Sequence, residues 1–180
     1  QPSLKYKPKA KPIKTLKRND IFEEAFIFAT NGTELSSEWS KSVVNECNKI
    51  KREISLQDIN SRKDLRNLNF VTIDGSNAKD FDDAVYAEEN SDGFLLYVAI
   101  ADVSEYVLEG SSLDKEAFSR ATSVYFEKKV IPMLPELISN KLCSLRPNED
   151  KLVLTCEIYL NREGEIKSFE FFNSVICSKN

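Results

Sequence analysis

Residues 71–85 read Val-Thr-Ile-Asp-Gly-Ser-Asn-Ala-Lys-Asp-Phe-Asp-Asp-Ala-Val. Four carboxylates, Asp74, Asp80, Asp82 and Asp83, fall within ten positions of this stretch, and short apolar runs lie on both sides of it. Crowded carboxylates raise one another's pKa unless a cation neutralises them, and hard cations such as Mg2+ or Mn2+ prefer oxygen ligands. The pattern therefore favours a divalent-metal site at the edge of a core, and proteins commonly use such sites for phosphate chemistry.

The segments around the acidic stretch predict a series of strands. Apolar and alternating runs indicate strands over residues 70–73, 82–87 and 94–103, and a final hairpin with arms at 151–160 and 166–177. The first arm of this hairpin alternates, so that one of its faces carries Leu152, Leu154, Cys156, Ile158 and Leu160.

Helices are predicted between these strands. Apolar residues at helical spacing indicate helices over residues 37–52 and 114–123 and a short one over 136–143, whereas 53–69 is polar and irregular. Ser36 or Ser37 can cap the first helix, and the inner side of the second carries Leu113, Ala117, Phe118 and Ala121. Interleaved helices and strands are typical of an α/β (α+β) domain, here a mixed sheet with flanking helices.

The 180 residues divide into three parts by composition. Residues 1–20 form a Lys- and Pro-rich connector with seven basic side chains and no acid before Asp20. Residues 21–69 form a largely helical lead-in, in which 21–30 is a short helix or a strand. The remaining 18 basic and 29 acidic residues give residues 20–180 a formal charge of −11. An acidic body binds nucleic acid poorly by itself, so positive surface would have to come from metal ions or other polypeptide.

Composition also limits the chemistry. The chain contains no histidine, and its four cysteines are widely spaced, which argues against zinc and against Ser-His or Cys-His nucleophiles. No apolar run is long enough to span a bilayer and no signal-peptide pattern is present, so we expect a cytoplasmic protein without a membrane partner.

Plainer interpretations of the acidic stretch remain open on these grounds. Asp74 and Gly75 could form only a hairpin turn, and Asp82 and Asp83 could be solvated. An EF-hand is excluded because Val85 stands where a bidentate Glu is required, and no phosphate-binding loop of the G-x-x-x-x-G-K-[ST] type exists. The metal alternative is a centre for phosphodiester cleavage, in which converging carboxylates hold cations against the phosphate.

The stretch from Thr72 to Val85 resembles the catalytic signature of the ribonuclease II / ribonuclease R (RNB) family of 3′-to-5′ exoribonucleases. Its Gly-Ser-Asn-Ala-Lys-Asp-Phe sequence is closer to the ribonuclease R branch. One departure is Asn77, where that branch usually has another acid. Further motifs agree in order and spacing, and the resemblance runs from about residue 60 to the end. They are Asp64-Leu-Arg, Val98-Ala-Ile-Ala-Asp-Val-Ser104, Thr122-Ser-Val-Tyr-Phe126, Val130-Ile-Pro-Met-Leu-Pro-Glu136 and Leu142-Cys-Ser-Leu-Arg-Pro147.

The resemblance implies a role for each matching residue. Asp74 and Asp83 correspond to aspartates that hold the catalytic Mg2+ (or Mn2+), and Asp80 to a further acidic member of the metal site. Asp82 corresponds to the aspartate most directly needed for cleavage, so that Asp80 and Asp82 are the catalytic candidates among the four metal ligands. Tyr125 corresponds to an RNA-binding aromatic residue that clamps bases near the 3′ end. Two further motif residues, Asp102 and Arg146, are expected to be mainly structural hydrogen-bonding groups.

The resemblance further implies that residues 70–180 are the N-terminal part of an RNB catalytic domain, and that residues 1–20 end a cold-shock region. The parent enzyme would degrade single-stranded RNA processively to nucleoside 5′-monophosphates, and an S1 barrel would follow its catalytic domain. We expect the isolated piece to be nearly inactive. The alternative is a non-catalytic interaction fragment of that enzyme, which binds a partner such as an RNA helicase.

Overall fold

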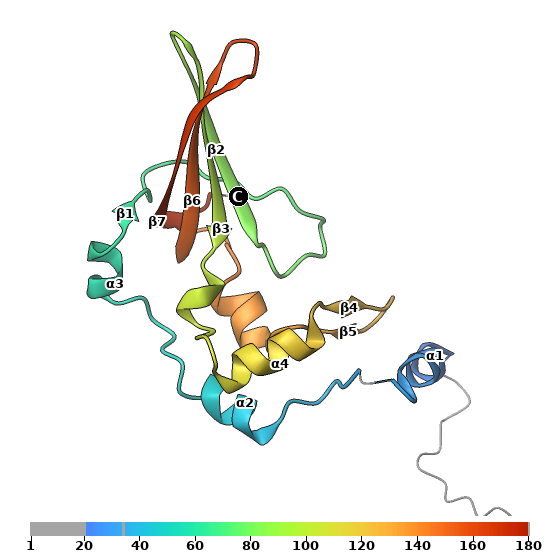
Figure 1. The fold of residues 1–180 in the computed structure, drawn as a ribbon. Helices are drawn as coiled ribbons and strands as arrows, with labels where there is room; N and C mark the ends of the chain where they lie inside the picture. Colours follow the sequence, from blue (N-terminus) through green and yellow to red (C-terminus); the bar gives the residue numbers. More distant parts are fainter. Residues whose placement is uncertain (1–20, 34, 180) are drawn as a thin grey trace, which may run out of the picture.

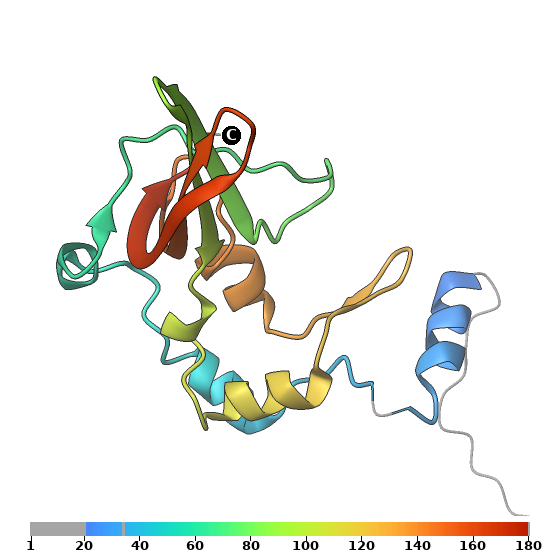
Figure 2. The same cartoon turned by 45° about the horizontal axis from the view of Figure 1, so that its top comes forward.

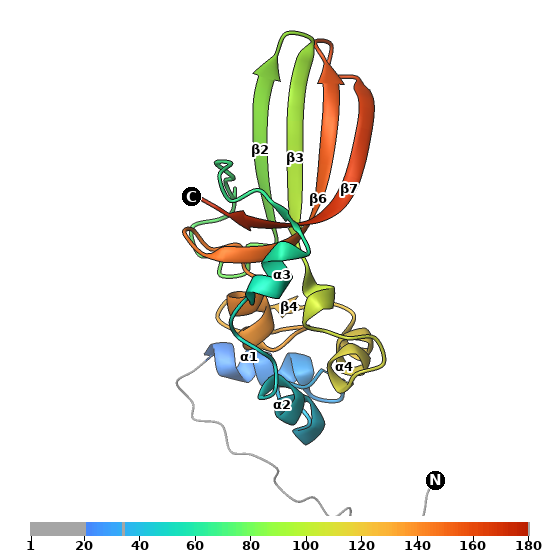
Figure 3. The ribbon, with the colours of Figure 1, turned by 90° about the vertical axis from the view of Figure 1, so that its left-hand side faces the viewer.

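A five-stranded sheet forms the centre of the computed structural model, which describes residues 21–33 and 35–179, so that the predicted connector lies outside the described residues. The strand order is β1-β7-β6-β3-β2 (Figures 1 and 3). Only β1 and β7 run parallel, and the other neighbours are antiparallel, which confirms the predicted mixed sheet. The strands are β1 (Lys63–Asp64), β2 (Asp83–Asn90), β3 (Gly93–Ala101), β6 (Asp150–Asn161) and β7 (Ile166–Cys177).

The helices gather mainly at one end of this sheet (Figure 1). A separate two-stranded hairpin, β4 (Val124–Tyr125) and β5 (Val130–Ile131), leaves the same region, and Figure 2 shows α1 standing beside it. No helix in the described part of the chain is long and apolar enough to cross a membrane. The helices are α1 (Ile21–Thr30), α2 (Lys41–Cys47), α3 (Leu56–Asn60) and α4 (Ser112–Arg120), with a 3-10 turn at Val103–Glu105 and a π-helix at Ile138–Leu142.

The predicted helix over 37–52 was wrong at both ends. Helix α2 begins only at Lys41, because the Ser40 side chain accepts the Val43 N–H at 3.4 Å and caps it there. It ends at Cys47, after which the backbone N–H groups of Lys49 and Ile50 bond only three residues back. Three serines precede the apolar run, so several capping positions compete and the sequence does not choose between them.

Two other local predictions were also wrong. The segment 53–69 is not irregular throughout, because Ser55 and Asp58 form a capping box that starts α3, and β1 follows. On α4, Phe118 points outward and is 87% exposed. The core side of α4 consists of Leu113 and Ala117, which are four residues apart and both buried.

The predicted strand over 70–73 forms only an isolated bridge between Val71 and Val85. Phe70 itself is completely buried, and its ring packs near those of Tyr86 and Tyr97. The buried Phe70 ring and this single bridge therefore fix the start of the acidic stretch against the sheet, without a continuous ladder of backbone hydrogen bonds.

The two faces of the sheet differ in burial. The alternating residues of β6 lie on one face as predicted, but this face is open enough to leave Leu154 43% exposed. The opposite face contains Val153, Thr155 and Glu157, which are buried together with Phe70 and Tyr97 of the core. The polar members of this face are satisfied there, since the Thr155 and Ser174 hydroxyls lie 2.6 Å apart and hydrogen-bond each other.

Candidate functional site

The acidic loop, residues 74–83, is fixed at both ends by backbone hydrogen bonds. Before it, Val71 and Val85 exchange two N–H···O bonds of 2.9 Å. At its end, the Asp82 carbonyl accepts the Ala101 N–H at 2.9 Å, and Asp83 is the first residue of β2. The loop therefore begins and ends on the β2 edge of the sheet.

A buried serine holds the middle of the acidic loop. The Ser144 hydroxyl donates to the Lys79 carbonyl at 2.9 Å and accepts the Phe81 N–H at 3.1 Å. The Leu145 N–H donates to the Phe81 carbonyl at 2.9 Å, and both Ser144 and Leu145 are completely buried. Sequence reasoning gave Ser144 no role. The only signal was a serine inside the otherwise apolar run of the Leu142–Leu145 motif.

Electrostatic crowding is concentrated on Asp82. Nearby protein atoms displace part of the water around its carboxyl group, although the residue as a whole is exposed, and this raises its pKa above the usual value. The charges of Asp80, Asp83 and Asp74 raise this pKa further, in that order. The structure thus brings the four sequence-predicted acids into one electrostatic group centred on Asp82.

Tyr125 joins this group. Its hydroxyl donates to Asp80 Oδ2 at 3.1 Å, although the two residues are 45 positions apart in sequence. The tyrosine is 66% exposed. Loss of water and the hydrogen bond to Asp80 raise the pKa of the Tyr125 phenol. The predicted base-stacking ring therefore lies directly beside one of the predicted metal ligands.

The donor chemistry of the acidic group fits a hard divalent cation. Four carboxylates supply oxygen ligands of the kind that Mg2+ takes, and a cation would relieve the repulsion that raises the pKa of Asp82. Within residues 21–33 and 35–179, however, no three acidic or Cys side chains are arranged so that they could hold one metal ion. Binding by three or more of these carboxylates would therefore require at least one side chain to move.

Asp102 lies just beyond β3 in a buried ion pair. Arg62 donates to Asp102 Oδ2 at 2.7 Å and to Glu105 at 2.8 Å, and Ser104 donates to Asp102 Oδ1 at 2.6 Å. These contacts agree with the structural role expected for Asp102. For Arg146, which we also expected to be structural, no side-chain hydrogen bond or ion pair is found among the described residues.

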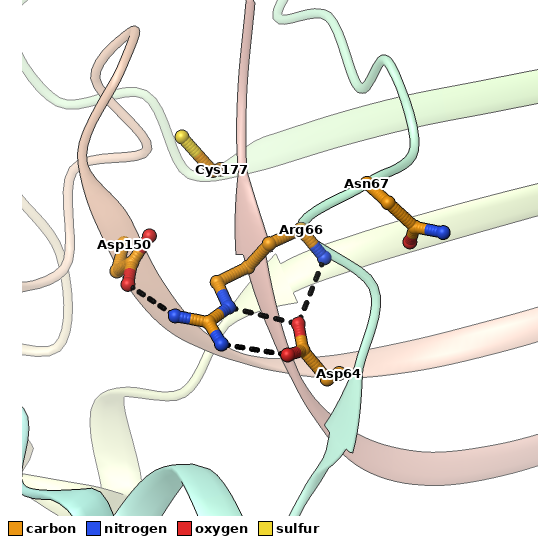
Figure 4. A pocket seen from close by; sticks show the side chains of 5 residues that line it. All are labelled: Asp64, Arg66, Asn67, Asp150 and Cys177. Atoms are coloured by element: carbon orange, nitrogen blue, oxygen red, sulfur yellow. Dashed lines mark hydrogen bonds and ion pairs between the residues drawn. The ribbon is translucent and has the colours of Figure 1, made fainter.

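An open pocket of about 550 Å3 lies at the β1–β7 edge, opposite the edge that contains β2 (Figure 4). Arg66 occupies its centre and bonds Asp64 at 2.6 and 2.8 Å and Asp150 at 2.8 Å. The hydrogen bonds from Arg66 lower the pKa of Asp64 to about 2. Since Arg66 already pairs with both carboxylates, the Asp64-Leu-Arg motif has a structural role and links the end of β1 to the start of β6.

The fold and the site define a mixed α/β domain with an acidic centre at one sheet edge and an exposed tyrosine bonded to that centre. The family model described as "RNB domain" matches residues 62–180, and the chain belongs to this family. The family resemblance drawn from the acidic stretch and its neighbouring motifs is therefore confirmed.

Individual relatives agree with the family. The chain is 48% identical over 147 residues to a Ribonuclease R of Buchnera aphidicola, covering 80% of the chain and 20% of the relative. It is 41% identical over 179 residues to the Escherichia coli Ribonuclease R, covering 99% and 22%. The chain thus spans about a fifth of the length of these relatives.

Solved structures of the Mycoplasma genitalium RNase R resemble the chain in fold. The structure of that enzyme in complex with double-stranded RNA matches with a TM-score of 0.79 at 38% identity, covering 87% of this chain and 27% of that one. The same enzyme with ribose-methylated single-stranded RNA gives the same TM-score over 24% of that chain.

Proposed function

We propose that this chain is part of the catalytic domain of a processive 3′-to-5′ exoribonuclease, which hydrolyses single-stranded RNA to nucleoside 5′-monophosphates. The observation that carries the proposal is the hydrogen bond that joins the exposed ring of Tyr125 to the acidic loop at Asp80. It places a surface on which a base can stack beside carboxylates suited to phosphodiester chemistry. Membership of the RNB family and relatives named Ribonuclease R support this assignment.

In this proposal the four aspartates have different roles. Asp74 and Asp83 are the main ligands of the catalytic Mg2+, and Asp80 is a further one. When bound, Mg2+ lowers the pKa of a water molecule and neutralises charge on the phosphate. Asp82 acts closest to the attacking water, because it corresponds to the aspartate most directly needed for cleavage in the family signature and the other three acids surround it.

Tyr125 would position the RNA by stacking. A base can stack on an aromatic ring whatever its identity, so a ring of this kind suits an enzyme that degrades RNA of any sequence. The acidic charge of residues 20–180 opposes RNA binding, so the phosphate backbone would need cationic surface from other polypeptide. We therefore propose that the 180-residue chain alone is nearly inactive.

A chimera tests the function. The match to the E. coli Ribonuclease R over 179 residues allows this chain to replace the corresponding region of that relative. With Mg2+, the chimera should release nucleoside 5′-monophosphates from single-stranded RNA. Asp82→Asn should lower that rate by about 10³-fold, the size expected for loss of a positioned base, while RNA affinity stays nearly unchanged.

The matched control is Asp92→Asn, the same substitution at an exposed aspartate in the β2–β3 turn, and it should leave the rate unchanged. A chimera that folds and binds RNA but releases no mononucleotides would contradict the proposed activity. A rate for Asp82→Asn equal to that of the parent chimera would contradict the role given to Asp82.

A further inference from the structure

Helix α1 packs against the tip of the β4–β5 hairpin. The rings of Phe26 and Phe126 meet edge to face with centroids 5.0 Å apart. Glu23 forms an ion pair with Lys129. Both lysines of the hairpin tip also contact aromatic rings of α1, since Lys128 Nζ lies 3.7 Å from the Phe22 ring centroid and Lys129 Nζ 4.5 Å from that of Phe26.

The hairpin has few other attachments to the body. It pairs only with itself and lies outside the five-stranded sheet. At its base, the Ser123 hydroxyl accepts the Met133 N–H at 2.9 Å, and Ile131 is buried. Its tip closes through the Phe126 N–H, which donates to the Lys129 carbonyl at 2.7 Å. Among the described residues, the other contacts that fix its direction are this base, where the Arg120 guanidinium also donates to the Pro132 carbonyl at 3.2 Å, and the Tyr125 hydrogen bond.

The order of residues along the first arm of the hairpin connects α1 with the acidic loop. Successive side chains of an extended segment point to opposite sides. Phe126 contacts α1, and its neighbour Tyr125 contacts Asp80. A rotation of this arm that broke the Phe126 contact would therefore also turn the Tyr125 ring away from the acidic loop.

We propose that α1 is a clasp that positions Tyr125, with Phe26 as its main positioning residue and Glu23 as a secondary one. Because α1 holds the neighbouring Phe126 and Asp80 bonds the Tyr125 hydroxyl, the Tyr125 ring keeps a fixed distance from the carboxylates. A base stacked on this ring would then lie at a fixed distance from the acidic loop. The consequence for RNA rests on the proposed function, but the positioning of the ring does not.

The first test needs no RNA. In the 180-residue chain labelled with 3-fluorotyrosine, Tyr125→Phe identifies the fluorine signal of Tyr125. Phe26→Ala should shift this signal, because the ring leaves the acidic loop, and remove the nuclear Overhauser contact between the ring and Asp80. The signal of Tyr97, which is buried in the core, should stay in place. Phe26→Tyr keeps a ring at this position and should restore the Tyr125 signal.

The matched control is Phe28→Ala on the same helix, because Phe28 is 77% exposed and no ring contact of it is found in the described structure. An unmoved Tyr125 signal in Phe26→Ala, or an equal movement in Phe28→Ala, would overturn the clasp. Should Phe26→Ala move the Tyr97 signal as well, Phe26→Leu takes its place under the same criterion.

The second test measures RNA kinetics in the chimera. Phe26→Ala should raise the KM for single-stranded RNA about fivefold, which corresponds to losing part of the free energy of one base-stacking contact. It should change kcat less than twofold. A KM equal to that of Phe28→Ala would contradict the link to RNA. If the chimera cuts no RNA but Phe26→Ala still moves the Tyr125 signal, the proposed function fails and the clasp stands.

Discussion

At the scale of single residues, two buried polar groups fix segments that are far apart in sequence. Ser144 bonds the backbone of residues 79 and 81, which precede it by 65 and 63 positions. Arg62 bonds Asp102 across 40 positions. Neither of the two takes part in the proposed chemistry. Both instead decide where the acidic loop and the end of β3 lie, so the geometry of the site depends on residues outside it.

Breaking the Arg62–Asp102 pair should cost stability at neutral pH. The side chains are only 6% and 10% exposed, so Asp102→Asn leaves a buried guanidinium with the more exposed Glu105 as its remaining carboxylate. We expect the free energy of unfolding to fall by about 3 kcal/mol, measured by urea denaturation at pH 7. Glu89→Gln breaks the exposed pair with Arg162 and should cost less than about 1 kcal/mol.

The stability difference between the parent chain and Asp102→Asn should depend on pH, and this dependence gives an independent check. Burial alone would raise the pKa of Asp102, but hydrogen bonds from Ser104 and Arg62 and the Arg62 charge lower it below the usual 3.8. A carboxyl with a lowered folded-state pKa stabilises fully above its unfolded pKa and loses this contribution as pH falls. The free energies of unfolding of the parent chain and of Asp102→Asn should therefore become more similar below about pH 4. A difference that grows there would refute the assignment.

The aspartates and Tyr125 could be predicted at this scale because each is part of a short motif with its own chemistry. Ser144 could not be predicted, since its partners are backbone atoms, which look alike at every position of a sequence. The hydrogen bond between Tyr125 and Asp80 could not be predicted either, for a related reason. It depends on the direction of a separate hairpin, and the spacing of residues does not give that direction.

At the scale of elements, the long strands were predicted well and the short elements poorly. Strands β3, β6 and β7 are marked by apolar runs that end at turns such as Ser91-Asp92-Gly93. By contrast, α2 has seven residues and α3 has five, and their ends depend on which serine caps them. The segment 70–73 resembled a strand because burial of Phe70 produces an apolar run without a ladder.

Gly93 begins β3 opposite Asn161 of β6, and a side chain there should disrupt this pairing. A Cβ atom on Gly93 would lie 2.0 Å from the backbone oxygen of Leu160, and φ is +153°. Gly93→Ala should therefore lower the free energy of unfolding by about 3 kcal/mol, through the clash and the strained backbone. Hydrogen exchange should quicken first at the amides near residues 93 and 161.

The control for Gly93 is Gly75→Ala in the acidic loop. A Cβ atom on Gly75 would meet nothing within 4 Å, and its φ does not lie in the left-handed region. This substitution should leave stability unchanged or raise it by about 0.5 kcal/mol, because it restricts the unfolded chain. Equal losses at the two glycines would show that the contact with Leu160 does not matter.

At the scale of the whole molecule, the sheet has one covered and one open face. Register places Phe169 beside Ile158 and Phe171 beside Cys156, so the exposed apolar residues of three strands share one face. Apolar patches of this kind are uncommon on monomeric soluble proteins. Burial on the opposite face supplies the core. The open-face residues with the largest exposure are Ile166, Phe169 and Phe171, followed by Ile100, Leu154 and Phe94.

This open face should bind the dye ANS, whose fluorescence rises on apolar surface. The rings of Phe169 and Phe171 are 63% and 62% exposed and contact each other at 5.8 Å. Changing both to Ser should remove most of the ANS signal, yet lower the free energy of unfolding by less than about 1.5 kcal/mol, the value of one exposed ring pair. Phe70→Ser, in the buried core, should instead cost about 4 kcal/mol.

Phe118→Ser separates exposure from clustering. Phe118 is more exposed than either ring of the pair, at 87%, but it stands on α4 away from the sheet. Its loss should leave the ANS signal nearly unchanged, because a single exposed ring offers the dye no continuous apolar surface. If Phe118→Ser lowers the signal as much as the double substitution does, the dye reports exposed rings in general, and the open face is not a distinct apolar surface.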